Sequence, residues 1–334
     1  MKKNKFNILL LIVVAFIVLY FSLSSDFEGI LKQLVSMNIV YVLLAILLMI
    51  MYWFIRSIIL HRLIIKFKPD YKFRTAFKLK LSTQFFNAIT PFASGGQPFQ
   101  ILVLKREGIN LSGGTNIVIQ NFIIYQVALI LLGIFAIIFN NVWGLFPDVG
   151  ILKQLVTIGF IVNTLVTLSM FLIAFNKRFN KFIVDSVIKL LSKVKIVKNT
   201  EKKLLEWQEN LNNFNVGAKE LMKNKGQFAF FVLLDIIALA SLYLVPLMVL
   251  YGTGDYNSFN ALECIIAVAY VMLMGSFVPL PGGTGGLEYG FTQFFGNFIS
   301  SSQLMAIMLV WRFITYYLGL FIGAIAFNIY SKEK

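Results

Sequence analysis

Charged side chains are rare inside the apolar segments of this sequence, and three of them could form an ionic site. Asp235, Glu288 and Arg312 each lie in a stretch that is otherwise almost free of charge. A charge is costly in lipid, so each is expected to face a polar interior or an opposite charge. Together they could bind a zwitterionic or anionic group, and the two carboxylates could pass protons. The alternative is a buried ion pair, such as Glu288 with Arg312, that only holds helices together.

Two further charges in apolar segments have simpler explanations. Arg56 and Glu263 lie near the ends of their segments, where a long side chain can reach the interface. Classical catalytic sets are missing from the sequence: it has one histidine, His61, and one cysteine, Cys264. This excludes a disulfide framework and a Cys/His zinc site, and it leaves no Ser/His/Asp set for nucleophilic catalysis. We expect no metal and no cofactor.

Proline and glycine interrupt two apolar stretches near their centres, in "TPFASGGQP" from Thr90 and in "PLPGGTGG" from Pro279. The interrupting residues are Pro91, Gly95, Gly96 and Pro98 in the first stretch and Pro279, Pro281, Gly282, Gly283, Gly285 and Gly286 in the second. Glycine allows a sharp turn with positive φ, and a helix that begins after such a turn offers free amides that suit a phosphate. Neither run matches a nucleotide-binding signature, so ATP binding is not expected.

These two stretches, 81–104 and 261–300, lie in a chain whose composition is typical of a membrane protein. Of 334 residues, 58% are hydrophobic and 13% are charged, with a mean hydropathy of +0.80. A soluble domain cannot cover its surface with so few charges. Broken backbone at membrane depth is tolerated only where protein or water satisfies it. We therefore predict an all-α polytopic protein, one membrane domain over 1–334, in which both stretches form re-entrant hairpins lining a cavity.

Six full crossings are expected besides the hairpins. Their predicted ranges are 6–23, 38–60, 117–139, 151–175, 228–250 and 304–329. The first is read as a retained helix, because no small-residue cleavage site follows it. The alternative is that 261–280 and the segment after it each cross fully, which makes eight crossings with the same end topology.

The net charge of +15 is concentrated in a few places. Residues 61–80 hold seven Lys or Arg and one acid, and the loop 176–226 holds twelve and five. Basic residues accumulate on the cytoplasmic side of membranes. We thus expect both loops and both termini to be cytoplasmic, in a multi-pass protein of the cytoplasmic membrane. This topology explains the charge without nucleic acid as a partner, although the loops could attract anionic lipid.

One offset relates the two halves of the chain. Pro91 and Pro279 open the two interrupted motifs, 188 positions apart, and the same shift places 38–60 nearly on the 228–250 crossing and 117–139 nearly on the 304–329 crossing. The first unit then starts outside and the second inside. Such inverted repeats are typical of transporters, with the substrate near the midplane at broken helices. We predict inverted repeats over 38–139 and 228–329. The alternative explanation of the offset is coincidence among apolar segments of similar length.

The loop 176–226 contains its own helical pattern. Apolar residues from Leu204 to Leu221 recur every three or four positions, with lysines and glutamates between them. This spacing predicts an amphipathic helix. It could lie on the cytoplasmic membrane surface or pack on the bundle. A face for docking a partner is the other interpretation.

"TPFASGGQPFQILVLKREG" and "SFVPLPGGTGGLEYGF" together resemble the transmembrane-region family of lysylphosphatidylglycerol synthase, the flippase part of the multiple peptide resistance factor. The resemblance covers nearly the whole chain. It implies movement of a phospholipid or glycolipid, such as aminoacylated phosphatidylglycerol, across the cytoplasmic membrane, and through it resistance to cationic peptides. The positions it marks are the break from Pro91 to Pro98, the break from Pro279 to Gly286 with Glu288, and Arg312.

The sequence departs from the lipid-synthesising relatives in one respect. Those carry a soluble aminoacyl-transferase domain after the membrane part, whereas this chain ends shortly after its last expected helix. A phosphatidylglycerol lysyltransferase activity has no catalytic domain in this sequence, and it stays only as an alternative. Three hypotheses remain: a lipid translocase acting on membrane phospholipids; a lipid-modifying transferase or its membrane subunit, with a separate soluble synthase as partner; and a membrane scaffold.

Overall fold

The computed structural model describes residues 26–146, 150–175, 215–276 and 278–332 of the chain. All regular elements in these ranges are helices. The one β-type contact within them is an isolated bridge that belongs to no strand. The crossing predicted at 6–23 lies outside the described residues, as does most of the loop 176–226. The chain is therefore an all-α polytopic protein, as the sequence predicts.

The first half contains four helices after a short amphipathic one. The helices are α2 (Phe27–Ser36), α3 (Ile39–Ile64), α4 (Phe73–Ala88), α5 (Gly96–Arg106) and α6 (Leu111–Trp143). Asparagine side chains cap two of them, because Asn38 accepts from the Val40 amide and Asn110 from the Gly113 amide. Gly144 ends α6 in the left-handed region, at φ 59°.

The second half also places two short helices, α12 (Ala261–Gly275) and α13 (Gly286–Phe295), between longer helical segments. It contains α10 (Lys225–Tyr243), α11 (Val245–Gly252), α12, α13, α14 (Ser301–Arg312), the π-helix η1 (Phe313–Tyr317) and α15 (Leu318–Lys332). Between the halves, α7 (Gly150–Phe175) packs on α6 and on α12. There, Asn163 of α7 donates a hydrogen bond to the Ser276 hydroxyl at 2.8 Å.

Five described helices are long and apolar enough to cross a membrane. They are Ile39–Ile64, Leu111–Trp143, Ile151–Ser169, Lys225–Gly252 and Ser301–Ile329. Each overlaps one of the crossings expected from the sequence. The hairpin helices are shorter, with 16 residues in α4, 11 in α5, 15 in α12 and 10 in α13. A full crossing takes about 20 residues, so none of these four has that length.

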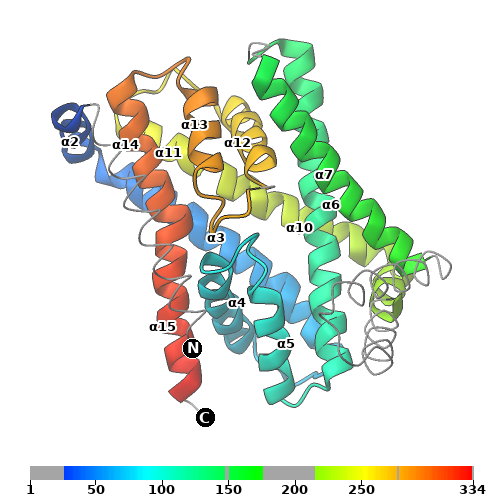
Figure 1. Cartoon of the computed structure of the whole chain (residues 1–334). Coiled ribbons are helices and arrows are strands. Elements are labelled where there is room, and N and C mark those ends of the chain that lie inside the picture. The colour runs from blue at the N-terminus through cyan, green and yellow to red at the C-terminus, as the bar shows by residue number, and fades with distance from the viewer. Residues whose placement is uncertain (1–25, 147–149, 176–214, 277, 333–334) are drawn as a thin grey trace, which may run out of the picture.

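The two hairpins point at each other from opposite ends of the molecule. In Figure 1 the connection between α4 and α5 points up from the lower half, and the connection between α12 and α13 points down from the upper half. They face each other near the middle, beside the long helices. The two interrupted motifs, far apart in sequence, are thus neighbours in the fold.

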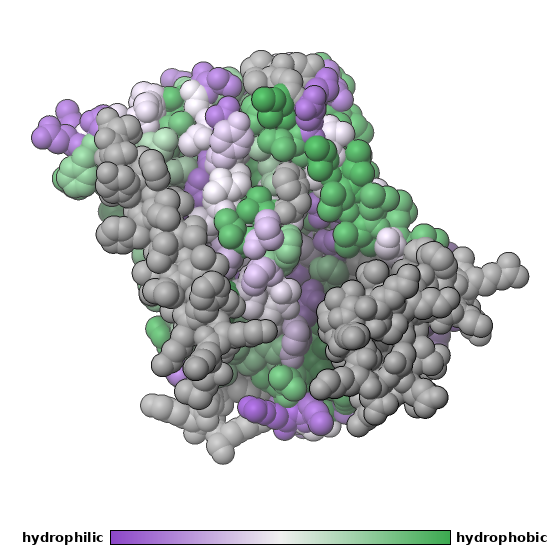
Figure 2. Space-filling view, in the orientation of Figure 1, coloured by the Kyte–Doolittle hydropathy of each residue, from purple (hydrophilic) through white to green (hydrophobic). Residues whose placement is uncertain are grey.

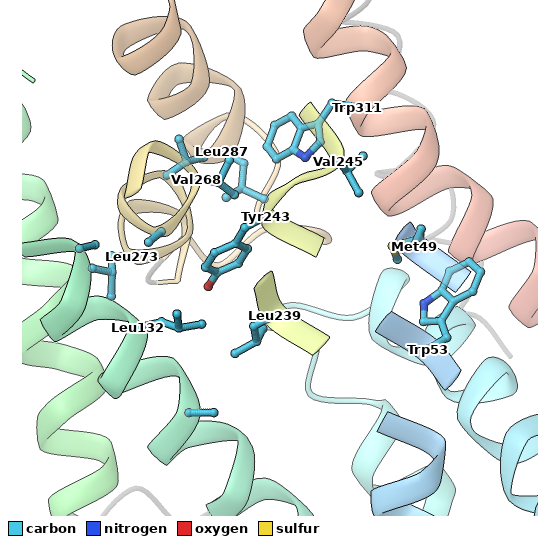
Figure 3. Close-up of a cluster of buried hydrophobic side chains, with 14 of the residues drawn as sticks. Met49, Trp53, Leu132, Leu239, Tyr243, Val245, Val268, Leu273, Leu287 and Trp311 are labelled. Atoms are coloured by element: carbon cyan, nitrogen blue, oxygen red, sulfur yellow. The ribbon is translucent and has the colours of Figure 1, made fainter. Parts of the chain in front are cut away.

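A continuous apolar core surrounds this meeting point. In Figure 3, Leu239 and Tyr243 of α10 lie near the centre, with Leu132 of α6 to the left, Leu287 of the second hairpin above and Trp311 at the upper right. Trp311 is fully buried and stacks on Phe291 of α13 with ring centroids 4.7 Å apart. Such stacking adds to the burial of both rings and holds α13 against α14.

The described end of the loop 176–226 packs on the bundle. Residues 215–223 are helical, and Ala218 and Leu221 are 2% exposed within the core. The Asn116 amide of α6 donates to Glu220 at 3.4 Å, and Gly217 lies against the same asparagine. Of the two simple expectations for this helix, packing on the bundle is the one that its described part follows.

Candidate functional site

The first interrupted motif forms a tight turn between α4 and α5. Phe92 and Ala93 take the left-handed backbone, at φ 53° and 51°, and the Ser94 hydroxyl donates to the Pro91 carbonyl at 2.9 Å. Non-glycine residues rarely adopt this conformation, because Cβ then approaches the following carbonyl. The hydroxyl of Thr90, two residues after α4, holds the turn by accepting from the Gly95 amide at 2.8 Å.

Polar side chains of α4 also satisfy the start of α5. Asn87 accepts from the Gly96 amide at 3.1 Å, and Gln100 donates to the Thr83 hydroxyl at 3.0 Å. A Cβ on Gly96 would lie 2.1 Å from the Asn87 oxygen, so this close approach requires glycine. Pro98 lies in the first turn of α5, where its missing amide breaks no helical hydrogen bond. The prediction that Pro98 breaks the helix is therefore wrong, because the break ends before Gly96.

The second interrupted motif forms the same turn with different residues. Gly282 and Gly283 take the left-handed backbone, at φ 66° and 63°, and the Thr284 hydroxyl donates to the Pro281 carbonyl at 2.7 Å. Pro281 thus takes the position of Pro91, and the offset between the turns is 190 residues (281 minus 91). The predicted offset of 188, which paired Pro91 with Pro279, is wrong by two residues, because Pro279 precedes the turn.

The two turns touch. Pro91 and Pro281 form an isolated antiparallel bridge, and the Tyr316 hydroxyl of η1 donates to the Ala88 carbonyl at the end of α4, at 2.9 Å. Tyr316 also covers the second turn, since a Cβ on Gly282 would lie 2.2 Å from its ring. One tyrosine therefore contacts both hairpins.

An ion pair lies directly on the second turn. Arg312 Nε is 2.7 Å from Glu288 Oε1, and their side chains are 8% and 10% exposed. Arg312 Nη2 also donates to the Gly282 carbonyl at 3.1 Å and to the Thr284 hydroxyl at 3.4 Å. The other oxygen of Glu288 accepts from the Gly285 amide at 2.7 Å. The structure thus brings Glu288 and Arg312 together with the glycine-rich turn, as the sequence predicts.

The π-helix sets the geometry of this contact. η1 begins directly after Arg312 and contains Tyr316, whose ring centroid is 4.8 Å from the guanidinium carbon. A π-turn adds a residue to the helical repeat and is frequent at functional sites. Here it lets Arg312 and Tyr316 reach the same turn. Tyr316 was not predicted, and the only sequence signal for it is its place one turn after Arg312.

Asp235 does not belong to this site. It is fully buried and pairs with Arg56 of α3, with Arg56 Nε 3.1 Å from Asp235 Oδ1. The guanidinium lies over the Tyr125 ring at 4.5 Å, and the Tyr52 hydroxyl accepts from it at 3.3 Å. The simple explanation for Arg56, a side chain reaching the interface, is therefore wrong, because it is 6% exposed inside the bundle. The predicted grouping of Asp235 with Glu288 and Arg312 is also wrong, because Asp235 pairs with Arg56 instead.

Glu263 has a local role. Its carboxylate accepts from the Asn260 amide at 2.8 Å, while Asn260 accepts from the Glu263 amide at 3.0 Å. This reciprocal cap stabilises the first turn of α12. Within the described ranges, no cluster of three or more His, Cys, Asp or Glu side chains has the geometry to hold a metal ion.

Comparison with known proteins agrees with this architecture. Residues 7–323 match the family described as the lysylphosphatidylglycerol synthase TM region. The chain belongs to this family. A UPF0104 membrane protein from Archaeoglobus fulgidus is 24% identical over 307 residues, which are 89% of this chain and 88% of that protein. Membership agrees with a lipid-related, multi-pass membrane protein. Both hairpins, Glu288 and Arg312 lie inside the part of the chain that matches the lysylphosphatidylglycerol synthase TM region.

Proposed function

We propose that the chain is a lipid translocase that moves a phospholipid, such as aminoacylated phosphatidylglycerol, or a related glycolipid across the membrane. The observation that carries this proposal is the contact between two interrupted hairpins with an ion pair at its centre. Backbone that is neither helix nor sheet is tolerated at membrane depth only beside protein or water. A headgroup passing the two turns would meet backbone carbonyls, hydroxyls and the Glu288–Arg312 pair.

The surface beside the turns supports the same proposal. In Figure 2 hydrophilic and near-neutral residues run down the middle of the face, over α13, the two turns and α5, with apolar surface over α7. Exposed residues of these elements include Tyr289 of α13 at 47% and, in the first hairpin, Ser94 and Gln97. A polar path flanked by apolar surface suits a lipid whose headgroup follows the protein while its acyl chains stay in the bilayer.

The proposed charge of the site also favours such a headgroup. Glu288 and Arg312 neutralise each other, so the pair presents one anionic and one cationic partner without a net charge. A zwitterionic or aminoacylated headgroup carries both complementary charges. It could exchange with each partner in turn, at a lower electrostatic penalty than a single buried charge would impose.

We further propose that residues 38–139 and 228–329 are inverted repeats. The same turn, the same order of helices and the opposed hairpins in Figure 1 support this. Lys105 and Asn297 are exposed near the outer ends of the two hairpins. In a Cys264→Ala background, Lys105→Cys should react with an impermeant thiol reagent from one face of the membrane and Asn297→Cys from the other. Labelling of both from one face would contradict the inverted arrangement.

Lipid movement is tested in proteoliposomes by the accessibility of labelled headgroups to an impermeant quencher, across aminoacylated phosphatidylglycerol, phosphatidylglycerol and a neutral glycolipid. Glu288→Gln should slow transport by roughly tenfold or more, since a hydrogen bond to a charged group is worth about 1.5–3 kcal/mol. The matched control is Glu263→Gln, which alters a carboxylate that only caps α12. Equal rates in empty liposomes, wild type and both variants would refute the proposal.

A further inference from the structure

A second cluster of buried charges lies away from the two turns, where α3, α4, α6 and α10 meet. Arg56 and Asp235 form its ion pair, and Lys80 of α4 interacts electrostatically with both. Asp235 is fully buried, Lys80 is 5% exposed and Arg56 is 6% exposed. The proposed transport site uses none of these three residues.

The cluster contains more positive than negative charge. Within the described part of the chain, Asp235 is the one carboxylate that attracts Lys80, and it already forms an ion pair with Arg56. Tyr52 and Tyr125 also face Arg56, and Tyr243 of α10 lies within range of Asp235, but these groups carry no charge near neutral pH. The helices α5 and α15, which also pack on α4, add no charged group that acts on Lys80 among the described residues.

A surplus charge in the interior is unfavourable, and only one member of the cluster can give it up. Arg stays protonated in proteins, whereas a buried Lys releases its proton readily. Asp235 has a buried oxygen, Oδ2, without a hydrogen-bond partner. That oxygen can accept from a Lys80 ammonium when the helices move. The cluster therefore has two balanced states: a neutral Lys80 amine beside the Arg56–Asp235 pair, and a Lys80 ammonium that shares Asp235.

The position of Lys80 links these states to the first hairpin. Lys80, Thr83 and Asn87 follow one face of α4 at spacings of three and four residues. Thr83 accepts from Gln100 of α5, and Asn87 accepts from the Gly96 amide directly after the turn. A change in how α4 is held at Lys80 is thus transmitted along a polar face to the turn that contacts Pro281.

We propose that Lys80, with Arg56 and Asp235, forms a proton-binding site that couples protonation to movement of the first hairpin. When the site empties, Lys80 loses one proton to water and becomes the neutral amine, while Arg56 keeps its charge and its pairing with Asp235. When it fills, one proton from water restores the ammonium. Coupling to lipid movement rests on the proposed transport function, but proton binding itself does not.

Proton binding is measured without transport, from the melting temperature of the purified full chain between pH 6 and 9. Stability rises with pH wherever the unfolded state binds more protons than the folded state. The wild type should therefore gain stability across this range relative to Lys80→Met, and Lys80→Met should melt higher than wild type at pH 6. Lys72→Met, on the exposed start of the hairpin, is the control and should keep the wild-type slope.

Parallel slopes for wild type and Lys80→Met would overturn the proposal. So would stabilisation by inorganic phosphate that disappears in Lys80→Met while the pH slope does not change, because the site would then bind an anion. If Lys80→Met gives no monodisperse protein, Lys80→Gln replaces it. If neither variant folds, a wild-type melting temperature that falls steadily from pH 6 to 9 overturns the proposal.

Coupling is measured in proteoliposomes with an imposed pH gradient. With one proton per lipid, a gradient of one pH unit sustains up to about a tenfold ratio of lipid between the leaflets. Lys80→Met should lower this ratio to about one while lipid still equilibrates. A wild type that moves no lipid refutes the transport proposal and leaves the melting experiment as the test of the proton site. A wild-type ratio of one with active movement overturns the coupling.

Discussion

The turn of the first hairpin carries side chains at the two positions where the turn of the second hairpin carries none. Phe92 and Ala93 adopt the left-handed backbone that Gly282 and Gly283 adopt in the second turn. The difference follows from what covers each turn. Phe92 is 60% exposed, whereas Gly282 lies under Tyr316 and beside Arg312. A turn that is packed against an arginine and a tyrosine has no room for side chains, and an open one can keep them.

The start of the following helix differs in the same way. In the first hairpin, the neutral side chains of Thr90 and Asn87 satisfy the Gly95 and Gly96 amides. In the second, Glu288 accepts from the Gly285 amide and pairs with Arg312. The comparison teaches that one backbone turn is stabilised by neutral hydrogen bonds in one half and by a buried charge pair in the other. Of the two turns, therefore, only the second is held by an ion pair.

The largest effect is expected from breaking the charge pair. Glu288→Leu leaves a buried guanidinium without its carboxylate and should lower the free energy of unfolding by about 3–5 kcal/mol. Adding Arg312→Met should recover part of this loss, because residues in contact are not additive. Chemical denaturation of the single and double variants measures the coupling.

The matched pair in the first hairpin is Gln100→Leu with Thr83→Val, which removes one neutral hydrogen bond. Replacing both partners of such a bond by apolar groups is nearly neutral. Equal coupling energies in the two hairpins, or additive effects at Glu288 and Arg312, would contradict the proposed difference between the halves.

The next largest effect is expected at Gly282. An alanine there would place its Cβ 2.2 Å from the Tyr316 ring, at φ 66°. Overpacking and backbone strain together should cost about 2–4 kcal/mol. Gly254→Ala separates the two causes, because Gly254 has φ 87° with nothing within 4 Å of its Cβ position. Melting temperatures that fall equally for both variants would show that Tyr316 does not press on the turn.

A smaller effect, of opposite sign in the two halves, is expected at the second left-handed position. Ala93→Gly relieves a backbone penalty of about 1–2 kcal/mol but adds chain entropy, so a gain of up to about 1 kcal/mol is expected. Gly283→Ala introduces that penalty and should destabilise. Thermal unfolding of the two variants is the measurement, and a loss of stability in both would mean that the turns are not equivalent.

The smallest effect is expected from pH, at the loop that precedes the second hairpin. Burial alone would raise the pKa of Asp255, but hydrogen bonds from the Ser258 hydroxyl and from the Ser258 and Asn257 amides outweigh it and hold that pKa below its usual value. A lowered folded-state pKa contributes stability above the unfolded value, and this is lost as pH falls through the folded one. Because Asp255 is partly exposed to solvent, the change should be small.

The loop before the first hairpin is held by a hydrogen bond that involves no carboxylate, because Lys68 donates to the Glu107 main-chain carbonyl at 2.9 Å. Amide exchange at Asn257 and Ser258 should therefore lose protection below about pH 4, and Asp255→Asn should remove this dependence. A similar loss of amide protection around Lys68 would show that acid destabilises both loops, and it would contradict a specific role for Asp255.

Much of this architecture could be predicted from the sequence. Long apolar runs predict the five described spans, because lipid requires about 20 apolar residues per helix. Pro91, Pro281 and the glycines after them predict two interruptions, because a helix cannot continue through them without losing hydrogen bonds. Pro98 misled because proline is harmless in a first helical turn. The offset was wrong by two residues because Pro279 and Pro281 are both prolines near the glycine run, and the sequence does not show which of them opens the turn.

The sequence by itself determined the membrane environment, the helices and the places where helices stop, since these depend on local composition and on backbone sterics. Only the tertiary structure decided which charges meet. It pairs Asp235 with Arg56, whereas the sequence grouped Asp235 with Glu288 and Arg312, and it selects the Glu288–Arg312 pair from those that the sequence allowed. Lys80 could be counted as one basic residue among seven until the fold buried it beside that first pair. Pairing depends on the distance and direction between helices that are far apart in the chain, and on the free energy of removing each charge from water, and neither quantity is local.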